Sequence, residues 1–182
     1  MKKFLAIIIT ILVVAFGIYL LVSFNERQIY LSELTPDYIE VGYYDLGVNE
    51  DYDGNELSLL VDDEEKTFDN GFFVHAHSTL VFDGLKDYNP KMFSVYLGVN
   101  QTARNNGNTS IKFMIYFDQE LVYESDEING DDEAIFVELE MNKVNRITLV
   151  VDDLGGNGND HAVWADPLLI YRGGKELAWK SI

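Results

Sequence analysis

Many short runs along the chain alternate apolar and polar residues with a period of two. After Ser23 no apolar pattern with a period of 3.6 residues is sustained, so no long amphipathic helix is predicted there. The clearest alternation runs through Ile111–Phe117. Runs of this kind predict strands at residues 38–44, 57–61, 72–82, 93–99, 111–117, 121–124, 134–140, 147–151 and 168–171.

Stretches rich in Asp, Asn and Gly separate these runs, as expected of turns. Asp118-Gln119 lies where a tight hairpin would join residues 111–117 to 120–124, although such turns favour Gly at the second position. Eight or more short strands without intervening helices predict an all-β fold, a two-sheet sandwich of jelly-roll or similar type. We expect this domain over residues 30–172, followed by a C-terminal extension over residues 173–182.

The start of the chain has a different pattern. The run Phe4–Asn25 carries no charge and follows Lys2 and Lys3. As a helix it would be about 33 Å long, enough to cross a hydrocarbon core of about 30 Å. We therefore predict one N-terminal transmembrane helix, an anchor within residues 1–25. The two lysines place the N-terminus in the cytoplasm and the following domain outside the cell membrane.

A cleaved signal peptide is the alternative for this segment. Ala15-Phe16-Gly17 offers small residues in a pattern suited to cleavage. Cleavage there would leave the apolar residues 18–22 as an exposed tail, and the apolar stretch is long for a signal peptide. A retained anchor is therefore the favoured interpretation.

Composition narrows the possible functions. Apolar residues make up 47% and aromatic residues 13%, which excludes a disordered acidic chain. The formal net charge is −18, and beyond residue 25 the 11 basic and 31 acidic residues give −20. Nucleic acid is therefore excluded as a partner. With no cysteine, the chain has no disulfide, thiol nucleophile, Cys-ligated zinc or lipidated cysteine.

A histidine motif, Val74-His75-Ala76-His77-Ser78, precedes the apolar residues 80–82. On a single strand His75 and His77 would share a face and form a candidate pair of metal ligands. Zinc normally needs three or four protein ligands, and the local sequence offers no third. The favoured interpretation is one buried, hydrogen-bonded histidine and one exposed histidine.

A second motif, Asp160–Asp166, follows a loop rich in Asp, Asn and Gly. Such residues supply the oxygen ligands that calcium prefers, and the candidates are Asp153, Asn157 and Asp160. The spacing does not match an EF-hand, and the same residue types form turns without a metal. Trp164 is a candidate exposed platform for a sugar ring, although a tryptophan entering a strand more often lies in the core.

Together these motifs resemble the NPCBM family, also classed as carbohydrate-binding module family 51. The resemblance extends from about Tyr30 to Tyr171. It rests on Leu31-Ser32-Glu33-Leu34, Asn70–Ser78, Leu97-Gly98-Val99, the hairpin after Phe117, Asp152-Asp153 and Asp160–Asp166. Residues that mark the family are His75, Ser78, Asp160, His161, Trp164 and Asp166.

The resemblance implies a jelly-roll sandwich that recognises galactose-containing glycans without catalysis, often with a structural calcium, and commonly beside a glycoside hydrolase module. This chain departs from the family in three ways. It has no catalytic module. The residues that lead into its histidine strand, Asn70-Gly71-Phe72-Phe73, are bulkier than usual for the family. In the hairpin turn Asp118-Gln119 replaces the usual Asp-Gly.

We therefore expect a non-catalytic, membrane-tethered, extracytoplasmic carbohydrate-binding module for galactose-containing or other neutral glycans. Aromatic faces stack on sugar rings, and polar side chains bond to the hydroxyls. The candidate sugar contacts are Trp164, His161, Tyr52, Arg104 and Asn106. A separate glycosidase or envelope protein is an expected partner.

Two alternatives remain open. The first is a cell-envelope scaffold or adhesion domain on the same fold that binds a protein and has lost sugar affinity, since a single module gains no avidity within its chain. The second is a metal hydrolase that combines Asp160-His161 with the His75/His77 pair. No nucleophile elbow, HExxH motif or carboxylate pair at glycosidase spacing supports this second alternative.

Overall fold

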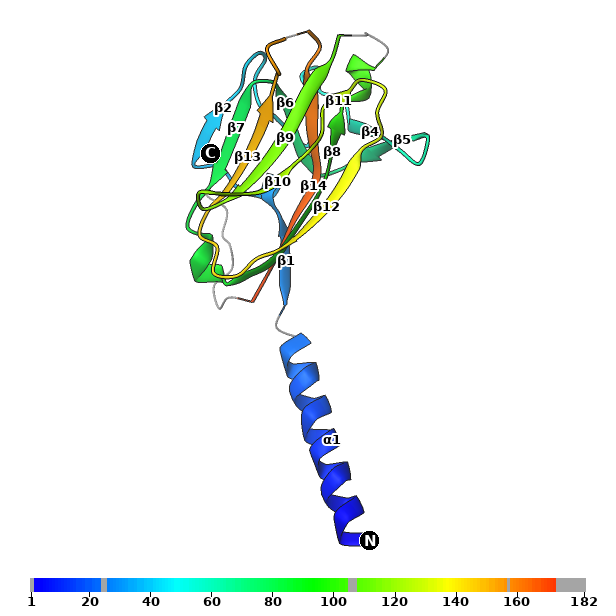
Figure 1. Cartoon of the computed structure of the whole chain (residues 1–182), viewed down its shortest axis with the longest axis vertical. Helices are drawn as coiled ribbons and strands as arrows, with labels where there is room; N and C mark the ends of the chain where they lie inside the picture. Colours follow the sequence, from blue (N-terminus) through cyan, green and yellow to red (C-terminus); the bar gives the residue numbers. More distant parts are fainter. Residues whose placement is uncertain (1, 24–25, 105–107, 157, 173–182) are drawn as a thin grey trace.

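A computed structural model of the chain describes residues 2–23, 26–104, 108–156 and 158–172. The first element is helix α1 (Lys2–Ser23), of which the side chains of residues 7–17 are described. The β-strands that follow build a sandwich, and α1 extends away from one end of it (Figure 1). The predicted C-terminal extension lies outside the described residues.

In the described part of the chain the strands form two six-stranded sheets and one separate hairpin, with antiparallel pairing throughout. In the first sheet the order is β12 (Ile135–Glu140), β8 (Pro90–Val99), β14 (His161–Tyr171), β6 (Gly71–His75) and β3 (Gly47–Val48), with β1 (Arg27–Tyr30) also paired to β14. In the second it is β10 (Glu120–Glu124), β9 (Ser110–Phe117), β13 (Ile147–Asp152), β7 (Ser78–Phe82) and β2 (Tyr38–Glu40), with β11 (Ile128–Asn129) paired to β9.

The separate hairpin consists of β4 (Leu57–Val61) and β5 (Glu64–Phe68). Three short 3-10 helices complete the domain: η1 (Leu31–Glu33), η2 (Leu85–Tyr88) and η3 (Gln101–Ala103). The predicted all-β sandwich is confirmed. The predicted hairpin turn is confirmed as well, because Asp118-Gln119 joins β9 to β10.

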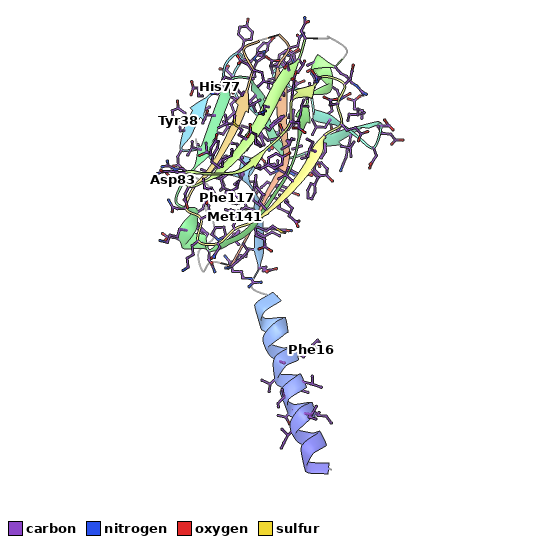
Figure 2. The ribbon with its side chains drawn as sticks, in the orientation of Figure 1. Phe16, Tyr38, His77, Asp83, Phe117 and Met141 are labelled. Carbon is purple, nitrogen blue, oxygen red and sulfur yellow. The ribbon has the colours of Figure 1, made fainter. Side chains whose placement is uncertain are left out.

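The main core lies between the two sheets and follows the period-two pattern. Along β9 every second residue from Ile111 to Phe117 is buried. Across the core, the Phe113 ring meets the Trp164 ring edge to face, with centroids 4.8 Å apart. Figure 2 shows how densely side chains fill this space, with Phe117 and Met141 among those labelled.

Trp164 was predicted to be exposed in a polar loop, and that prediction is wrong. The segment Asp160–Asp166 enters strand β14, which lies between β6 and β8 in the middle of the first sheet. On this strand the Trp164 side chain points into the core and is 0% exposed. It cannot stack on a sugar at the surface.

A second, smaller core lies on the outer face of the first sheet. Leu57, Leu59 and Phe68 of the β4–β5 hairpin pack there against Phe73 and Val163. Because successive residues of a strand point to opposite faces, Phe73 and Val163 share this outer face with the residues two positions away on β6 and β14. Those residues are His75 and His161.

Across the described residues, no helix is both long enough and apolar enough to cross a membrane. The predicted transmembrane helix is therefore not confirmed.

Candidate functional site

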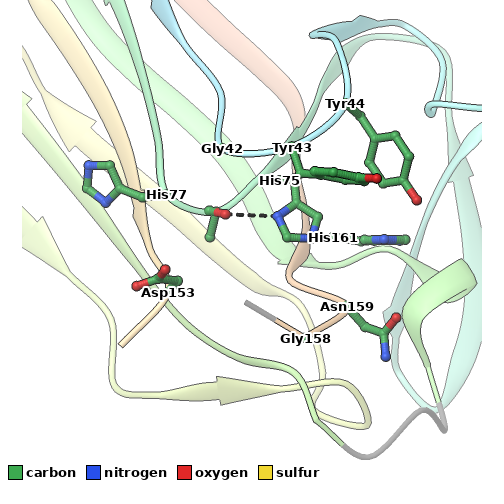
Figure 3. A pocket seen from close by; sticks show the side chains of 10 residues that line it. Gly42, Tyr43, Tyr44, His75, His77, Asp153, Gly158, Asn159 and His161 are labelled. Atoms are coloured by element: carbon green, nitrogen blue, oxygen red, sulfur yellow. Dashed lines mark hydrogen bonds between the residues drawn. The ribbon is translucent and has the colours of Figure 1, made fainter. Parts of the chain in front are cut away.

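A pocket of about 590 Å³ lies at the end of the sandwich where β6 ends and β14 begins (Figure 3). Three segments build it: the β2–β3 loop, the turn between β6 and β7, and the segment that leads into β14. We call it the histidine pocket. Its lining is Gly42, Tyr43, Tyr44, His75, Ala76, His77, Asp153, Gly158, Asn159 and His161.

Two buried histidines form the floor of this pocket. His75 and His161 are register partners on β6 and β14, with ring centroids 5.6 Å apart. His75 Nδ1 lies 2.8 Å from the carbonyl oxygen of Ala76. Since a carbonyl oxygen can only accept, this nitrogen carries the proton, and Nε2 of neutral His75 is left as an acceptor.

His161 is held by a hydrogen bond and by aromatic contacts. Its Nδ1 lies 3.2 Å from the hydroxyl of Thr102. Its ring packs edge to face against Tyr52 and Phe73, with centroids 5.2 and 5.4 Å away. Burial lowers the pKa of His161, nearby His75 lowers it further, and Asp51 acts in the opposite direction. Burial therefore favours the neutral form of the His161 imidazole.

Exposed tyrosines stand beside the histidine pair. Tyr43 is 64% exposed and Tyr44 is 44% exposed. The Tyr44 ring stacks on the Tyr52 ring with centroids 4.4 Å apart and an angle of 16° between the planes. Both Tyr43 and Tyr44 also contact the His75 ring edge to face. Aromatic surface at the rim and polar imidazoles beneath it are therefore combined in one place.

Gly42 allows the tyrosine loop to lie this close to the histidines. Its N–H donates to the carbonyl oxygen of His75 over 3.2 Å. A Cβ at this position would lie 2.8 Å from both the carbonyl carbon of Ala76 and the nitrogen of His77, closer than real Cβ atoms approach backbone. Any larger residue would therefore push the loop away from the pocket.

Asp51 fixes the loop that carries Tyr52. This carboxylate is 3% exposed, and its Oδ1 accepts the N–H groups of Asp53 and Asn55, each over 2.9 Å. Two backbone hydrogen bonds close the same turn, from Asp51 N–H to the Asn55 carbonyl and from Gly54 N–H to the Asp51 carbonyl. The Tyr52 ring is thus carried by an ordered turn and held against His161.

The structure brings some of the predicted sugar contacts together and separates others. His161 lines the histidine pocket, and Tyr52 contacts it from the side. Arg104 lies away from the pocket lining, where its guanidinium donates to Gln101 and pairs with Asp131. Asn106 and the predicted calcium ligand Asn157 lie outside the described residues.

Tyr43 and Tyr44, which line the histidine pocket, were not among the predicted site residues. They were assigned to the end of a strand, but β2 stops at Glu40 and both tyrosines belong to the loop after it. A Gly followed by two tyrosines was the only local signal. It could not show that this loop folds over a histidine motif about thirty residues further along the chain.

The expectation that His75 and His77 share one face is wrong. β6 ends at His75 and β7, in the other sheet, begins at Ser78, so a turn separates the two histidines. The peptide bond between Ala76 and His77 is cis. His77 is exposed and points away from His75 (Figure 3), which confirms the favoured interpretation of one buried and one exposed histidine.

The other motif residues support the scaffold. Ser78 is buried at the start of β7. Asp166 lies at an irregularity in the β14–β8 register between Ala165 and Leu168, and its N–H donates to the carbonyl of Asn70. Burial raises the pKa of the Asp166 carboxyl. Neither Ser78 nor Asp166 lines the histidine pocket.

Asp160 is the described residue best suited to a cation. Its side chain is 1% exposed, and its Oδ1 accepts the N–H of Ser110 over 3.3 Å. Its Oδ2 is buried and has no hydrogen-bond partner among the described residues. Burial raises the pKa of this carboxyl, because removal from water disfavours its charged form.

The rest of a calcium site is not assembled by the described side chains. Asp153 lines the histidine pocket, and its Oδ1 accepts the N–H of Gly155 over 3.0 Å. No group of three or more His, Cys, Asp or Glu that could hold a metal occurs in the part of the chain that the structure describes. The calcium site therefore stays a prediction that rests on the unpartnered oxygen of Asp160.

Comparisons with known proteins agree with the sandwich fold. Residues 27–170 match the family profile described as NPCBM/NEW2 domain. A search of curated protein sequences finds no match. Among solved structures, the chain is similar to the CBM51 from Clostridium perfringens GH95 in complex with methyl-galactose. The identity is 33% and the TM-score 0.74, and the match covers 79% of this chain and 99% of that one.

Two further structures are similar. The CBM51-2 and INT domains from Clostridium perfringens ZmpB match with 27% identity and a TM-score of 0.75, and that protein was also solved in complex with GlcNAc. The match covers 80% of this chain and 32% of that chain, so this chain spans about a third of it. The tandem CBM51 modules of a Streptococcus pneumoniae family 98 glycoside hydrolase share the fold, with 22% identity and a TM-score of 0.73 over 86% of this chain and 50% of that one.

Proposed function

The chain belongs to the NPCBM/NEW2 domain family, and from that premise we propose that it binds neutral glycans in the histidine pocket. The observation that carries this proposal is the exposed pair Tyr43 and Tyr44 beside the buried pair His75 and His161. A sugar ring offers an apolar C–H face and a rim of hydroxyls. The tyrosine faces suit the first and the imidazole nitrogens suit the second.

The ligand class follows from the charges around the pocket. Asp153 is part of the lining, and the chain beyond residue 25 carries a formal charge of −20. Sugars with carboxylate or sulfate groups would be repelled, whereas neutral sugars would not. Methyl-galactose and GlcNAc, which occupy the two similar modules, are both neutral. We therefore name galactose-containing and other neutral glycans as the ligands of this chain.

We propose a non-catalytic role for the module. Its two buried histidines face aromatic rings, and the carboxylate of Asp51 is occupied by backbone N–H groups. The pocket therefore offers groups that hold a sugar by hydrogen bonds and stacking. A separate glycosidase or envelope protein would supply any chemistry on the same glycan.

Isothermal titration of the purified domain with methyl-galactose and GlcNAc tests the proposal. We expect measurable binding of at least one of them, and a loss of about tenfold or more in Tyr44→Ala, because one aromatic stacking contact is removed. Tyr38→Ala is the matched control, since Tyr38 is 52% exposed on β2 and does not line the pocket (Figure 2). A folded protein that binds no neutral sugar, or equal losses in the two variants, would refute the site.

We also propose that the N-terminal segment tethers the module to the cell membrane, with the module on the outer side. The support is the uncharged run Phe4–Asn25 after Lys2 and Lys3, most of which lies in helix α1 (Lys2–Ser23). Fractionation of cells that make the full chain tests this. The protein should stay with membranes in alkaline carbonate, and external protease should digest it in intact cells. Recovery in the soluble fraction, or full protection from protease, would contradict the tether.

The exposed edge of the second sheet favours one other candidate function. Tyr38 is 52% and Ile39 is 46% exposed on the edge strand β2, and a sheet edge of this kind can pair with another protein. In that case the chain would be a cell-envelope scaffold or adhesion domain. Crosslinking through β2 to an envelope protein, with no sugar bound by folded protein, would favour this candidate over the first.

A further inference from the structure

The histidine pocket is the first of three adjoining depressions. A second pocket, of about 510 Å³, shares Tyr44 with it and lies along the loop that carries Glu50 and Tyr52. A third, of about 670 Å³, shares Asp51 with the second and reaches the β4–β5 hairpin. The three pockets therefore follow one another around the Tyr44–Tyr52 stack.

We call the third depression the hairpin pocket, lined in part by Ser58, Glu65, Thr67 and Thr102. Its construction follows from the alternation of the hairpin. Leu57, Leu59 and Phe68 point toward the first sheet, so the residues between them point away from it. Ser58 and Thr67 are register partners and both line this pocket, where Ser58 is largely buried and Thr67 is exposed.

One hydrogen bond connects the histidine pocket with the hairpin pocket. Thr102 of η3 lines the hairpin pocket, and its hydroxyl lies 3.2 Å from Nδ1 of His161 in the floor of the histidine pocket. The turn held by Asp51 stands between them and carries Tyr52, which is 36% exposed. The path from one pocket to the other therefore crosses an ordered, partly exposed aromatic ring.

Resting on the proposed function, we infer that the ligand is a neutral oligosaccharide of two or more sugars rather than a single sugar. Pockets of about 300–1,000 Å³ hold drug-sized ligands, and the histidine pocket, at 590 Å³, falls within that range. The terminal sugar would lie in the histidine pocket. The next would cross Tyr52 toward the hydroxyls of Ser58 and Thr67 and the carboxylate of Glu65.

The chemistry of the hairpin pocket selects the kind of sugar. Glu56 and Glu65 are exposed carboxylates that accept hydrogen bonds from sugar hydroxyls, and the threonine and serine hydroxyls can both donate and accept. A uronic or sialic acid at this point would meet like charges. The hairpin pocket therefore suits an uncharged sugar unit that is rich in hydroxyl groups.

Titration calorimetry with two sugar series tests this inference. One compares methyl-galactose with lactose and globotriose, and the other compares GlcNAc with chitobiose and chitotriose. In at least one series we expect the trisaccharide to bind about tenfold more tightly than the single sugar, which corresponds to one or two additional hydrogen bonds. Amide resonances of residues 58, 65 and 67 should shift with the trisaccharide and stay unchanged with the single sugar.

Matched variants test whether the second sugar unit occupies the hairpin pocket. Glu65→Gln combined with Thr67→Ala should remove the gain of the trisaccharide over the single sugar. Glu64→Gln should keep the gain, because Glu64 lies on the same strand outside the pocket lining. Trisaccharides that bind no tighter than single sugars, or a gain that survives the double variant, would overturn the inference and leave the proposed function intact. If no neutral sugar of either series binds folded protein, both the inference and the proposed function fail.

Discussion

His75 and His161 face each other across β6 and β14, with their ring centroids 5.6 Å apart, although 85 residues lie between them in the chain. The two sequence motifs that contain them are therefore one structural unit. Each motif supplies one imidazole to the outer face of the first sheet. The apolar residues beside them, Val74 and Ala162, lie on the opposite face, in the main core. A single strand pair thus contributes to both the core and the pocket.

The buried imidazole of His161 makes the stability of the domain sensitive to pH. Its pKa in the folded protein lies below the unfolded value of 6.5. As the pH falls below about 6.5 the unfolded chain binds a proton that the folded protein resists, so the free energy of unfolding decreases until the lowered folded pKa is passed. We expect the melting temperature to fall between pH 7.5 and pH 5.5.

His161→Gln provides the test of that assignment, and His77→Gln is its control, since His77 is exposed. The first variant should flatten the pH dependence of the melting temperature, and the second should leave it unchanged. The raised pKa values of buried Asp160 and partly buried Asp166 act in the opposite direction at lower pH, because these carboxyls gain protons more readily when folded. A pH profile that is the same in His161→Gln and the parent protein would contradict the prediction.

Replacing Trp164 should affect stability and leave sugar affinity largely unchanged. Trp164→Ala removes a fully buried side chain that packs against Phe113, and a loss of about 3–5 kcal/mol in the free energy of unfolding is expected. Trp164→Phe should cost less, because the indole N–H has no hydrogen-bond partner among the described residues. Urea unfolding and sugar titration of Trp164→Phe distinguish the two roles. If a folded Trp164→Phe protein no longer bound sugar, the prediction would be contradicted and Trp164 would have a role in binding.

Much of the fold could be predicted from the sequence, because burial alternates along strands such as β9 and β13. The runs at residues 111–117 and 147–151 correspond closely to β9 and β13, and the run at residues 57–61 coincides with β4. The prediction failed where polar residues occur inside a strand. The motif Asp160–Asp166 resembles a loop in composition, but its histidine faces the pocket and its tryptophan fills the core.

The candidate site could be predicted only in part, because it depends on contacts between segments distant in sequence. His161 and Tyr52 carry a recognisable chemistry, whereas the position of Tyr43 and Tyr44 depends on contacts distant in sequence. The loop is fixed by the approach of Gly42 to the turn at Ala76, and no local pattern encodes such an approach. Period-two patterning therefore identifies strands, but it does not show which loops meet at their ends.

Gly42→Ala should separate the tyrosine loop from the histidines without unfolding the sandwich. The added Cβ would lie 2.8 Å from the carbonyl carbon of Ala76, so the loop must move. We expect sugar affinity to fall about tenfold or more, while the melting temperature changes by a few degrees. Gly156→Ala is the control, because a Cβ there would meet its nearest atom at 3.6 Å, an ordinary contact. Equal sugar affinities for the two variants would show that the approach of Gly42 is not needed for binding.

Removal of calcium tests the role of the buried Asp160 carboxylate. If a cation binds the unpartnered Oδ2, it stabilises only the folded state, by about 2.7 kcal/mol at a concentration one hundred times its dissociation constant. We expect EDTA to lower the melting temperature, added CaCl₂ to restore it, and Asp160→Asn or Asp153→Ala to abolish both effects. Asp63→Ala is the control, because Asp63 is an exposed acidic residue of the β4–β5 turn. An identical melting curve with and without EDTA would show that no calcium ion stabilises the fold through Asp160.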